Sequence, residues 1–182
     1  MSRYSDIYAT VAEGFTKTIN SCTDEAWGSS SPCEGWTARD IAVHSAETHW
    51  RVASMVTGSE PLAVDPAGDV AAQWTEASRQ INGSLADSSL ATKMVPSRGG
   101  EMPWEQLVGT MLSADTLLHT WDIARAAGLD ERLDPMAVES VYEFMKPNDK
   151  LLRVPGGFAD KIEAPPGSDL QTQLLCFSGR MV

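Results

Sequence analysis

Apolar residues recur at every third or fourth position along most of this chain, and glycine and proline interrupt the pattern at intervals. The first such stripe is formed by Ile7, Val11, Phe15 and Ile19. This spacing places side chains on one face of an α-helix, whereas a half-buried strand needs alternation with period two. No stretch of useful length alternates in that way. The chain is therefore predicted to be all-α, most simply a four-helix bundle with additional short helices.

Residues that favour helix ends locate the predicted elements. Thr37, with Asp40 three residues later, has the pattern of an N-cap with a capping box. Asp-Pro pairs at 65–66 and 134–135 each predict an N-cap followed by proline at the first helical position. The stretch ATKMVPSRGGEMPWEQ is expected to be irregular with a short extended piece. The predicted helices span 4–20, 37–56, 65–85, 103–127 and 134–145, with a short one in LQTQLLCF.

Length and charge limit the classes of function. The 182 residues are enough for a single domain, expected over 1–182, with a core of its own. A formal net charge of −11 repels phosphate backbones and anionic lipids, so neither nucleic acid nor a membrane is an expected partner. A membrane-spanning apolar run and a signal-peptide pattern are both missing, and three cysteines without a C-x-x-C pair are typical of a reducing compartment. We therefore expect a cytoplasmic protein whose partner is a small-molecule substrate.

The stretch ADTLLHTWDIARAAG carries polar residues on the face that should be apolar. Asp115 and His119 are one helical turn apart and point the same way, and His44 lies on the apolar stripe of the helix predicted over 37–56. A carboxylate and two imidazoles from facing helices can hold a divalent metal such as zinc, with a fourth position left for water or substrate. The alternative is that Asp115 and His119 form a buried hydrogen-bonded pair and that His44 is a satisfied core histidine. The spacing alone leaves both interpretations open.

Two further acids are candidates for catalysis. Glu47, three residues after His44, can approach the site as an acid or base, or it can be an ordinary solvated charge on the helix. Asp122 can orient His119 from the next turn, because metal-bound imidazoles usually donate their other N–H to an acceptor. Alternatively, Asp122 pairs with Arg125 or with another arginine.

The remaining histidine and two of the cysteines receive structural predictions. His49 is about 140° around the helix from the inward stripe and is expected to face solvent. Cys33 is favoured as a small residue of a tight loop over a reactive thiolate near a helix N-terminus. Cys176 is expected in the core.

Three segments carry a resemblance to a known family. They are SPCEGWTARDIAVH around His44, DTLLHTWDIARAAG around His119, and the tail SDLQTQLLCFSGR. Together they resemble the DinB-like superfamily, near the metal-binding N-terminal domain of mycothiol-dependent maleylpyruvate isomerase. The resemblance extends from about Tyr4 to Arg180. It implies a four-helix bundle that holds a divalent metal, zinc or nickel, with three side chains that match His44, Asp115 and His119.

The same resemblance implies a kind of chemistry. Members with known activity often use the metal to activate a low-molecular-weight thiol, mycothiol or bacillithiol, for isomerisation or S-transfer. The isomerase carries glutamate where this chain has Asp115, and aspartate is one methylene shorter. The isomerase also has an additional C-terminal domain that helps to form its active site, and this chain is not expected to hold such a domain. The isomerase activity itself is therefore not expected here, whereas a homodimer through an exposed helix face is compatible with the superfamily.

Three functions follow as hypotheses. The first is a metal-dependent thiol transferase or isomerase, with zinc as the preferred ion, nickel as the alternative, and Glu47 or Asp122 moving protons. The second is a non-catalytic metal-binding or ligand-sensing module. The third is a helical interaction protein whose inward polar cluster is only structural. A G-x-S-x-G elbow, a P-loop and a G-x-G-x-x-G loop are all missing, so the sequence does not favour a serine hydrolase, a nucleotide hydrolase or a Rossmann dehydrogenase.

Overall fold

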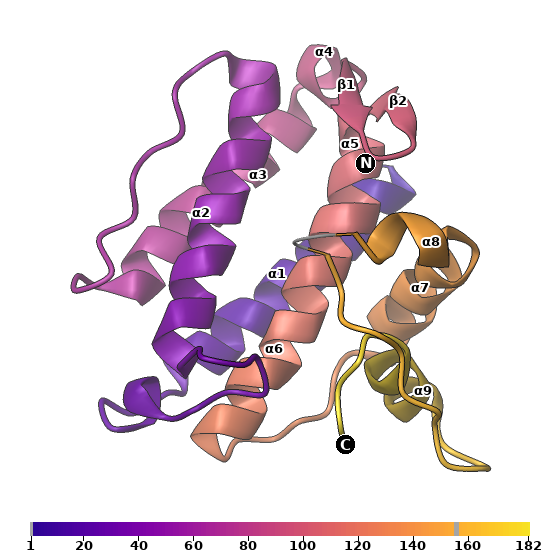
Figure 1. Ribbon diagram of the computed structural model, residues 1–182. Helices are drawn as coiled ribbons and strands as arrows, with labels where there is room; N and C mark the ends of the chain where they lie inside the picture. The colour runs from indigo at the N-terminus through magenta and orange to yellow at the C-terminus, as the bar shows by residue number, and fades with distance from the viewer. Residues whose placement is uncertain (1, 155–156) are drawn as a thin grey trace.

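Four long helices form the centre of the protein, of which a computed structural model describes residues 2–154 and 157–182 (Figure 1). These helices are α1 (Arg3–Asn20), α2 (Ala38–Thr57), α3 (Val70–Ala86) and a continuous helix made of α5 (Trp104–Leu107), the π-helical turn η2 (Val108–Leu112) and α6 (Ser113–Ala127). Both α1 and α2 pack against α3 on one side and against α6 on the other. The all-α prediction is confirmed, and this ring of four helices places inward side chains of α2 and α6 opposite each other.

Shorter elements complete the fold. A hairpin of β1 (Met94–Ser97) and β2 (Gly100–Pro103) pairs antiparallel in the segment predicted to be irregular, with Val95 opposite Met102. The other elements are η1 (Ala26–Gly28), α4 (Ser88–Ala91), α7 (Pro135–Met145), η3 (Lys146–Asn148), α8 (Asp149–Leu152) and α9 (Leu170–Phe177). In Figure 1, α7, α8 and α9 gather on one side of α6. Among the described residues, no helix combines the length and apolar character that crossing a bilayer requires.

The N-terminus of α2 has the predicted capping box. The Thr37 side chain accepts from the backbone N–H of Asp40, and the Asp40 carboxylate accepts from the backbone N–H of Thr37. This arrangement satisfies donors that a helix start otherwise leaves free. Gly58 ends the helix with φ of 72°, a left-handed conformation that suits glycine. The helix that carries His44 is thus fixed at both ends by local sequence.

The predicted start of the third helix at Asp65 is wrong. The Asp65 side chain instead accepts from the backbone N–H of Ala67, and the Asp65 backbone carbonyl accepts from the N–H of Gly68, which closes a turn over Asp65–Gly68. The N-cap is Asp69, whose carboxylate accepts from the backbone N–H of Ala72. Aspartate favours both turns and helix starts through the same hydrogen bond to a following N–H, so the Asp-Pro pair did not distinguish them.

The buried apolar side chains form two main groups that meet along α1 and α6. One group fills the space inside the ring of four helices and includes Phe15, Ile41 and Trp74. The other packs α7 and α9 onto the opposite face of α6 and includes Leu118 and Leu174. Helix α6 is therefore covered on two sides, which explains why its residues 116–124 are all buried.

Candidate metal centre

Three predicted ligands meet between α2 and α6. Nε2 of His44, from α2, lies 3.8 Å from Oδ2 of Asp115, and Nε2 of His119 lies 3.5 Å from Oδ1 of the same carboxylate. Each residue offers one donor atom, and these atoms all lie within 4.8 Å of one another. The two imidazole rings are 5.3 Å apart between centroids and nearly perpendicular. The structure thus brings together the carboxylate and the two imidazoles from neighbouring helices.

These separations suit a shared cation better than direct hydrogen bonds. An N–H···O bond has its donor and acceptor about 2.7–3.2 Å apart, shorter than either contact. Two ligand atoms on a tetrahedral zinc ion at about 2.1 Å are about 3.4 Å apart. In addition, Oδ2 of Asp115 is buried and has no hydrogen-bond partner among the described residues. An ionised oxygen in that position needs compensation, and a divalent cation would supply it.

The charges of the centre are strongly coupled. Burial disfavours the ionised form of Asp115, but the neighbouring His119 and His44 outweigh burial and lower the pKa of Asp115 to about 2. Burial likewise disfavours the imidazolium of His119, but Asp115 and the hydrogen bond to Asp122 raise the pKa of His119 to about 10. Without a metal, His119 is therefore a cation between two carboxylates at neutral pH.

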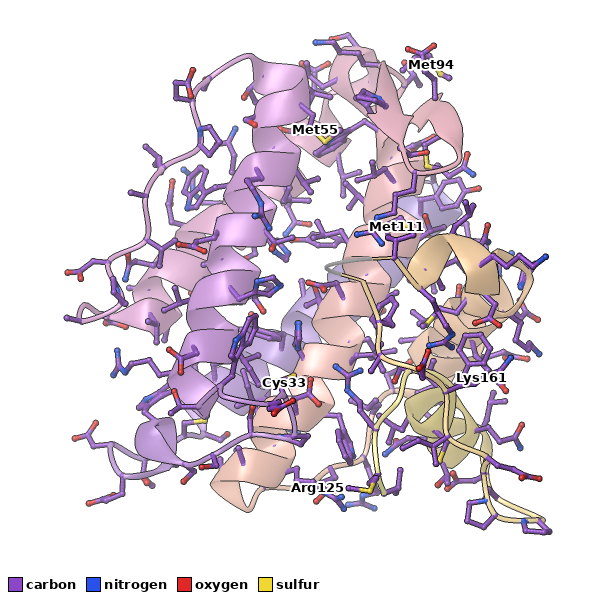
Figure 2. All side chains as sticks on the ribbon, in the orientation of Figure 1. Cys33, Met55, Met94, Met111, Arg125 and Lys161 are labelled. Carbon is purple, nitrogen blue, oxygen red and sulfur yellow. The ribbon has the colours of Figure 1, made fainter. Side chains whose placement is uncertain are left out.

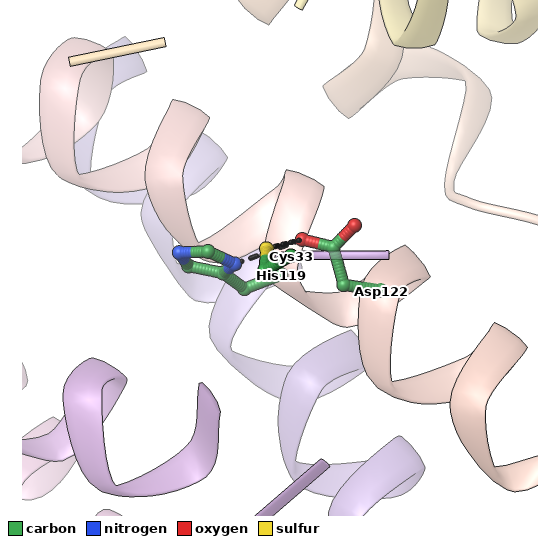
Figure 3. A group of neighbouring side chains, drawn as sticks. All are labelled: Cys33, His119 and Asp122. Atoms are coloured by element: carbon green, nitrogen blue, oxygen red, sulfur yellow. Dashed lines mark hydrogen bonds and ion pairs between the residues drawn. The ribbon is translucent and has the colours of Figure 1, made fainter. Parts of the chain in front are cut away.

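Asp122 contacts Nδ1 of His119, whereas Asp115 faces Nε2 of the same ring; Figure 3 shows Asp122 with His119 and Cys33. Its Oδ2 lies 2.9 Å from Nδ1 of His119 and accepts from the Sγ of Cys33 at 3.4 Å. Arg180 donates to both oxygens, at 2.8 and 2.6 Å. Burial opposes ionisation of Asp122, but His119 and Arg180 together lower the pKa of Asp122 to about 2. Asp122 therefore accepts a hydrogen bond from Nδ1 of His119. This leaves Nε2 of His119 directed toward Asp115 and His44.

A second group of donor atoms, from Cys33, His119 and Asp122, is also close enough to hold a metal. However, the contact between His119 and Asp122 has hydrogen-bond length, and the guanidinium of Arg180 already neutralises the carboxylate. A cation bound there would either displace Arg180 or be destabilised by repulsion from its positive charge. The group of His44, Asp115 and His119 is therefore the better metal site.

A cavity of about 640 Å³ opens onto this site, within the usual range for small-molecule pockets. His44, Asp115 and His119 lie in its wall. The loop before α2 contributes Trp36, whose ring is 4.9 Å from that of His44 between centroids, and Cys33, labelled in Figure 2 beside α6. The remaining lining comes largely from α8 and the C-terminal part of the chain: Leu152, Phe158, Ala159, Ser178, Gly179 and Arg180. A separate cavity of about 380 Å³, between α1, α6 and segment 129–134, contains none of the three ligands.

The other sequence predictions have mixed outcomes. His49 was predicted to face solvent, and this is wrong: it is fully buried between Tyr8 and Trp74 and bonds the Ser45 carbonyl through Nδ1. The error arose because α2 packs on two neighbours, so its buried surface is wider than one stripe. Glu47 is exposed and does not line the cavity.

The arginine partner of Asp122 is Arg180, whereas Arg125 pairs with Glu131. Cys176 is buried, as predicted. Cys33 is partly buried in the loop, where its backbone N–H donates to the Ser31 hydroxyl. The sequence analysis assigned no role to Arg180. The feature that could have indicated a role is its position in the segment SDLQTQLLCFSGR, which resembles the family.

Comparison with known proteins identifies the family of the chain. Two Mycobacterium tuberculosis proteins of uncharacterized function, Rv0738 of strain H37Rv and MT0763 of strain CDC 1551, are each 29% identical to the chain over 173 residues. Those alignments cover 93% of this chain and 93% of each relative. No solved structure matches. Residues 8–124, which include the three candidate ligands, match the model of the mycothiol maleylpyruvate isomerase N-terminal domain. The chain therefore belongs to the family of the mycothiol maleylpyruvate isomerase N-terminal domain.

Proposed function

We propose that the protein binds a divalent metal, zinc by preference and nickel as the alternative, through His44, Asp115 and His119. The observation that carries this proposal is the spacing of the three donor groups at the wall of a cavity, where Oδ2 of Asp115 has no hydrogen-bond partner among the described residues. Two neutral imidazoles and one carboxylate leave one position of a tetrahedral ion for an external ligand. That position would face the cavity that the ligands line.

We further propose that the protein is an enzyme acting with a low-molecular-weight thiol, mycothiol or bacillithiol, in S-transfer or isomerisation. Support comes from the family, whose description refers to mycothiol, and from a cavity large enough for a small molecule. A bound divalent cation would supply Lewis acidity that favours the thiolate form of a coordinated thiol at neutral pH.

The residues of the chain have separate tasks in this proposal. Asp122 holds the imidazole of His119, and because it is fully buried and shared with Arg180 we assign it a positioning role rather than proton transfer. Trp36 lies against the rings of His44 and His119 in the cavity wall, where we assign it the task of packing both imidazoles. Glu47 has no task, because it is exposed away from the cavity lining.

Metal analysis of the purified protein tests the first step. Wild-type protein should hold about one equivalent of zinc, and His44→Ala, Asp115→Ala and His119→Ala should each lose it. Glu47→Ala is the matched control, because it lies one turn along the same helix and is exposed. Equal zinc content in the wild type and the three ligand variants would refute the site.

A turnover screen tests the second step. The zinc-loaded protein would be incubated with mycothiol or bacillithiol and a panel of electrophilic or isomerisable acceptors. Loss of free thiol would report S-transfer, and conversion of the acceptor without net loss of thiol would report isomerisation. Either change, if it is absent in His44→Ala, supports the enzyme. Stoichiometric zinc without turnover across the panel would instead favour the non-catalytic metal-binding or ligand-sensing module.

A further inference from the structure

Arg180 lies outside the segment that matches the family model, yet it reaches the candidate metal centre. It follows α9 near the end of the chain, and its side chain is only 10% exposed. Its guanidinium makes two parallel bonds to the Asp122 carboxylate, through Nε to Oδ1 and through Nη2 to Oδ2. Its Nη1 also donates to the Ser178 hydroxyl at 3.1 Å. This two-point geometry fixes the plane of the carboxylate as well as its charge.

The carboxylate so fixed accepts from Nδ1 of His119 and from the Sγ of Cys33, both at Oδ2. Asp122 is completely buried, so without Arg180 its charge would be expensive to maintain. Without the two parallel bonds from Arg180, the carboxylate would be free to turn, and its Oδ2 would no longer be held against the Nδ1–H of His119. The imidazole would lose the partner that determines which nitrogen carries the hydrogen.

We infer that Arg180 is a positioning residue for the metal centre, which acts through Asp122 to keep the Nε2 lone pair of His119 directed to the metal. The inference rests on the proposed function, because it needs a metal held by His119. It assigns to the C-terminal segment a role in the chemistry of a site whose ligands all come from the family-matched segment.

A purely structural role for Arg180, as the anchor of the C-terminal tail, makes a different prediction. The tail is also attached to α6 by Arg125, labelled near the end of that helix in Figure 2, which donates through Nη1 to the Met181 carbonyl at 2.9 Å. Arg125 does not touch Asp122 in any described contact, since its carboxylate partner is Glu131. Arg125→Met therefore weakens the attachment of the tail but leaves the hydrogen bonds from Arg180 to Asp122 and from His119 to Asp122 in place.

The experiment compares the wild type with Arg180→Met, Arg180→Lys and Arg125→Met. Zinc affinity would be measured by competition with a chromophoric chelator, and the Nδ1 proton of His119 followed as a low-field ¹H resonance of the zinc-loaded protein. We expect Arg180→Met to bind zinc about 10–100-fold more weakly and to lose the resonance. Arg180→Lys should lie between it and the wild type, because an ammonium restores the charge but not the two-point geometry. Arg125→Met should keep both the affinity and the resonance of the wild type.

The outcomes separate this inference from the proposed function. Wild-type affinity and an unshifted resonance in Arg180→Met would overturn the inference and leave the metal site intact. The same holds if Arg125→Met weakens zinc binding as much as Arg180→Met does. Should Arg180→Met not fold, Arg180→Lys decides, and an affinity and resonance equal to the wild type would overturn the inference. Failure of the wild type to bind zinc would overturn both the proposed function and the inference.

Discussion

His49 is a neutral imidazole in the interior of the four-helix ring. Its ring lies 4.4 Å from that of Trp74 and 5.8 Å from that of Tyr8 between centroids. Nδ1 bonds the Ser45 carbonyl one turn earlier, whereas Nε2 has no partner among the described residues. Burial disfavours the charged form and is only partly offset by that carbonyl, so the pKa of His49 falls from 6.5 to about 4.

This lowered pKa predicts acid sensitivity in a defined window. Between pH 6.5 and about 4 the unfolded chain binds a proton at His49 that the folded protein does not, so the free energy of unfolding falls as the pH is lowered through that window. At about 1.4 kcal/mol per pH unit, the loss is on the order of 3 kcal/mol. Urea unfolding of the metal-free protein at several pH values measures it. His49→Phe should give a flatter dependence, and equal slopes in the two proteins would contradict the prediction.

At the residue scale, the sequence predicted the candidate ligands but not their surroundings. The three candidate ligands could be predicted from the sequence because each interrupts an apolar stripe, and the helical period of such a stripe is visible in the local sequence. They are His44, Asp115 and His119. The contact of Asp122 with His119 was also predicted, but its partners Arg180 and Cys33 were not identified, because they lie 58 and 89 residues away in the chain. Nothing in local spacing specifies which distant side chain meets a buried carboxylate.

At the scale of elements, the π-helical turn η2 allows α1 to lie very close to the helix that carries two of the ligands. Gly109 in this turn is buried against Tyr4 of α1, and the hydroxyl of Ser113 donates to the Val108 carbonyl five residues earlier. A π-helical turn inserts one extra residue into an α-helix. The continuous helix was predicted from Pro103 to Ala127 and is found over 104–127, but the turn itself was not predicted. Gly109 of this turn meets Tyr4 of α1, and a contact between two helices is not visible in the local spacing of either one.

Gly109→Ala should therefore be clearly destabilising. A Cβ at this position would lie 2.5 Å from the Cβ and 2.6 Å from the Cα of Tyr4, so the two helices would have to move apart. We expect a loss of about 1–3 kcal/mol or more in the free energy of unfolding.

Gly14→Ala is the matched control within α1, because its added Cβ would meet no atom within 4 Å. That variant should gain about 0.5–1 kcal/mol from helix propensity. Chemical denaturation compares the two, and similar effects of both substitutions would show that the close contact does not matter.

At the scale of the whole molecule, the candidate centre depends on two parts of the chain that are joined through α6. The family-matched segment 8–124 supplies the ligands, and the segment that follows supplies Phe158, Ala159 and Arg180 to the cavity. Because α6 carries ligands on one face and packs α7 and α9 on the other, a change in either part is transmitted to the same helix. Changes at Phe158 and Ala159 should therefore alter what the cavity accepts, whereas a change at Arg180 should reach His119 through Asp122.

The charges of the whole site predict that metal binding releases protons. In the metal-free protein, burial acts against the charge of His119, but Asp115 and Asp122 raise the pKa of His119 to about 10, so its imidazole is protonated at pH 7.5. Nε2 of His119 would have to lose its proton to bind a metal, and a divalent cation would take the place of that proton beside the Asp115 carboxylate. Calorimetric titration with zinc in buffers of different ionisation enthalpy should show release of about one proton or more per zinc bound. The apparent affinity should rise about tenfold per pH unit between pH 7 and 8.5, and thermal stabilisation by zinc should rise with it.

Glu47→Ala should behave like the wild type. Binding heats that are identical in all buffers would mean that zinc binds without displacing the His119 proton, and therefore not at Nε2 of His119.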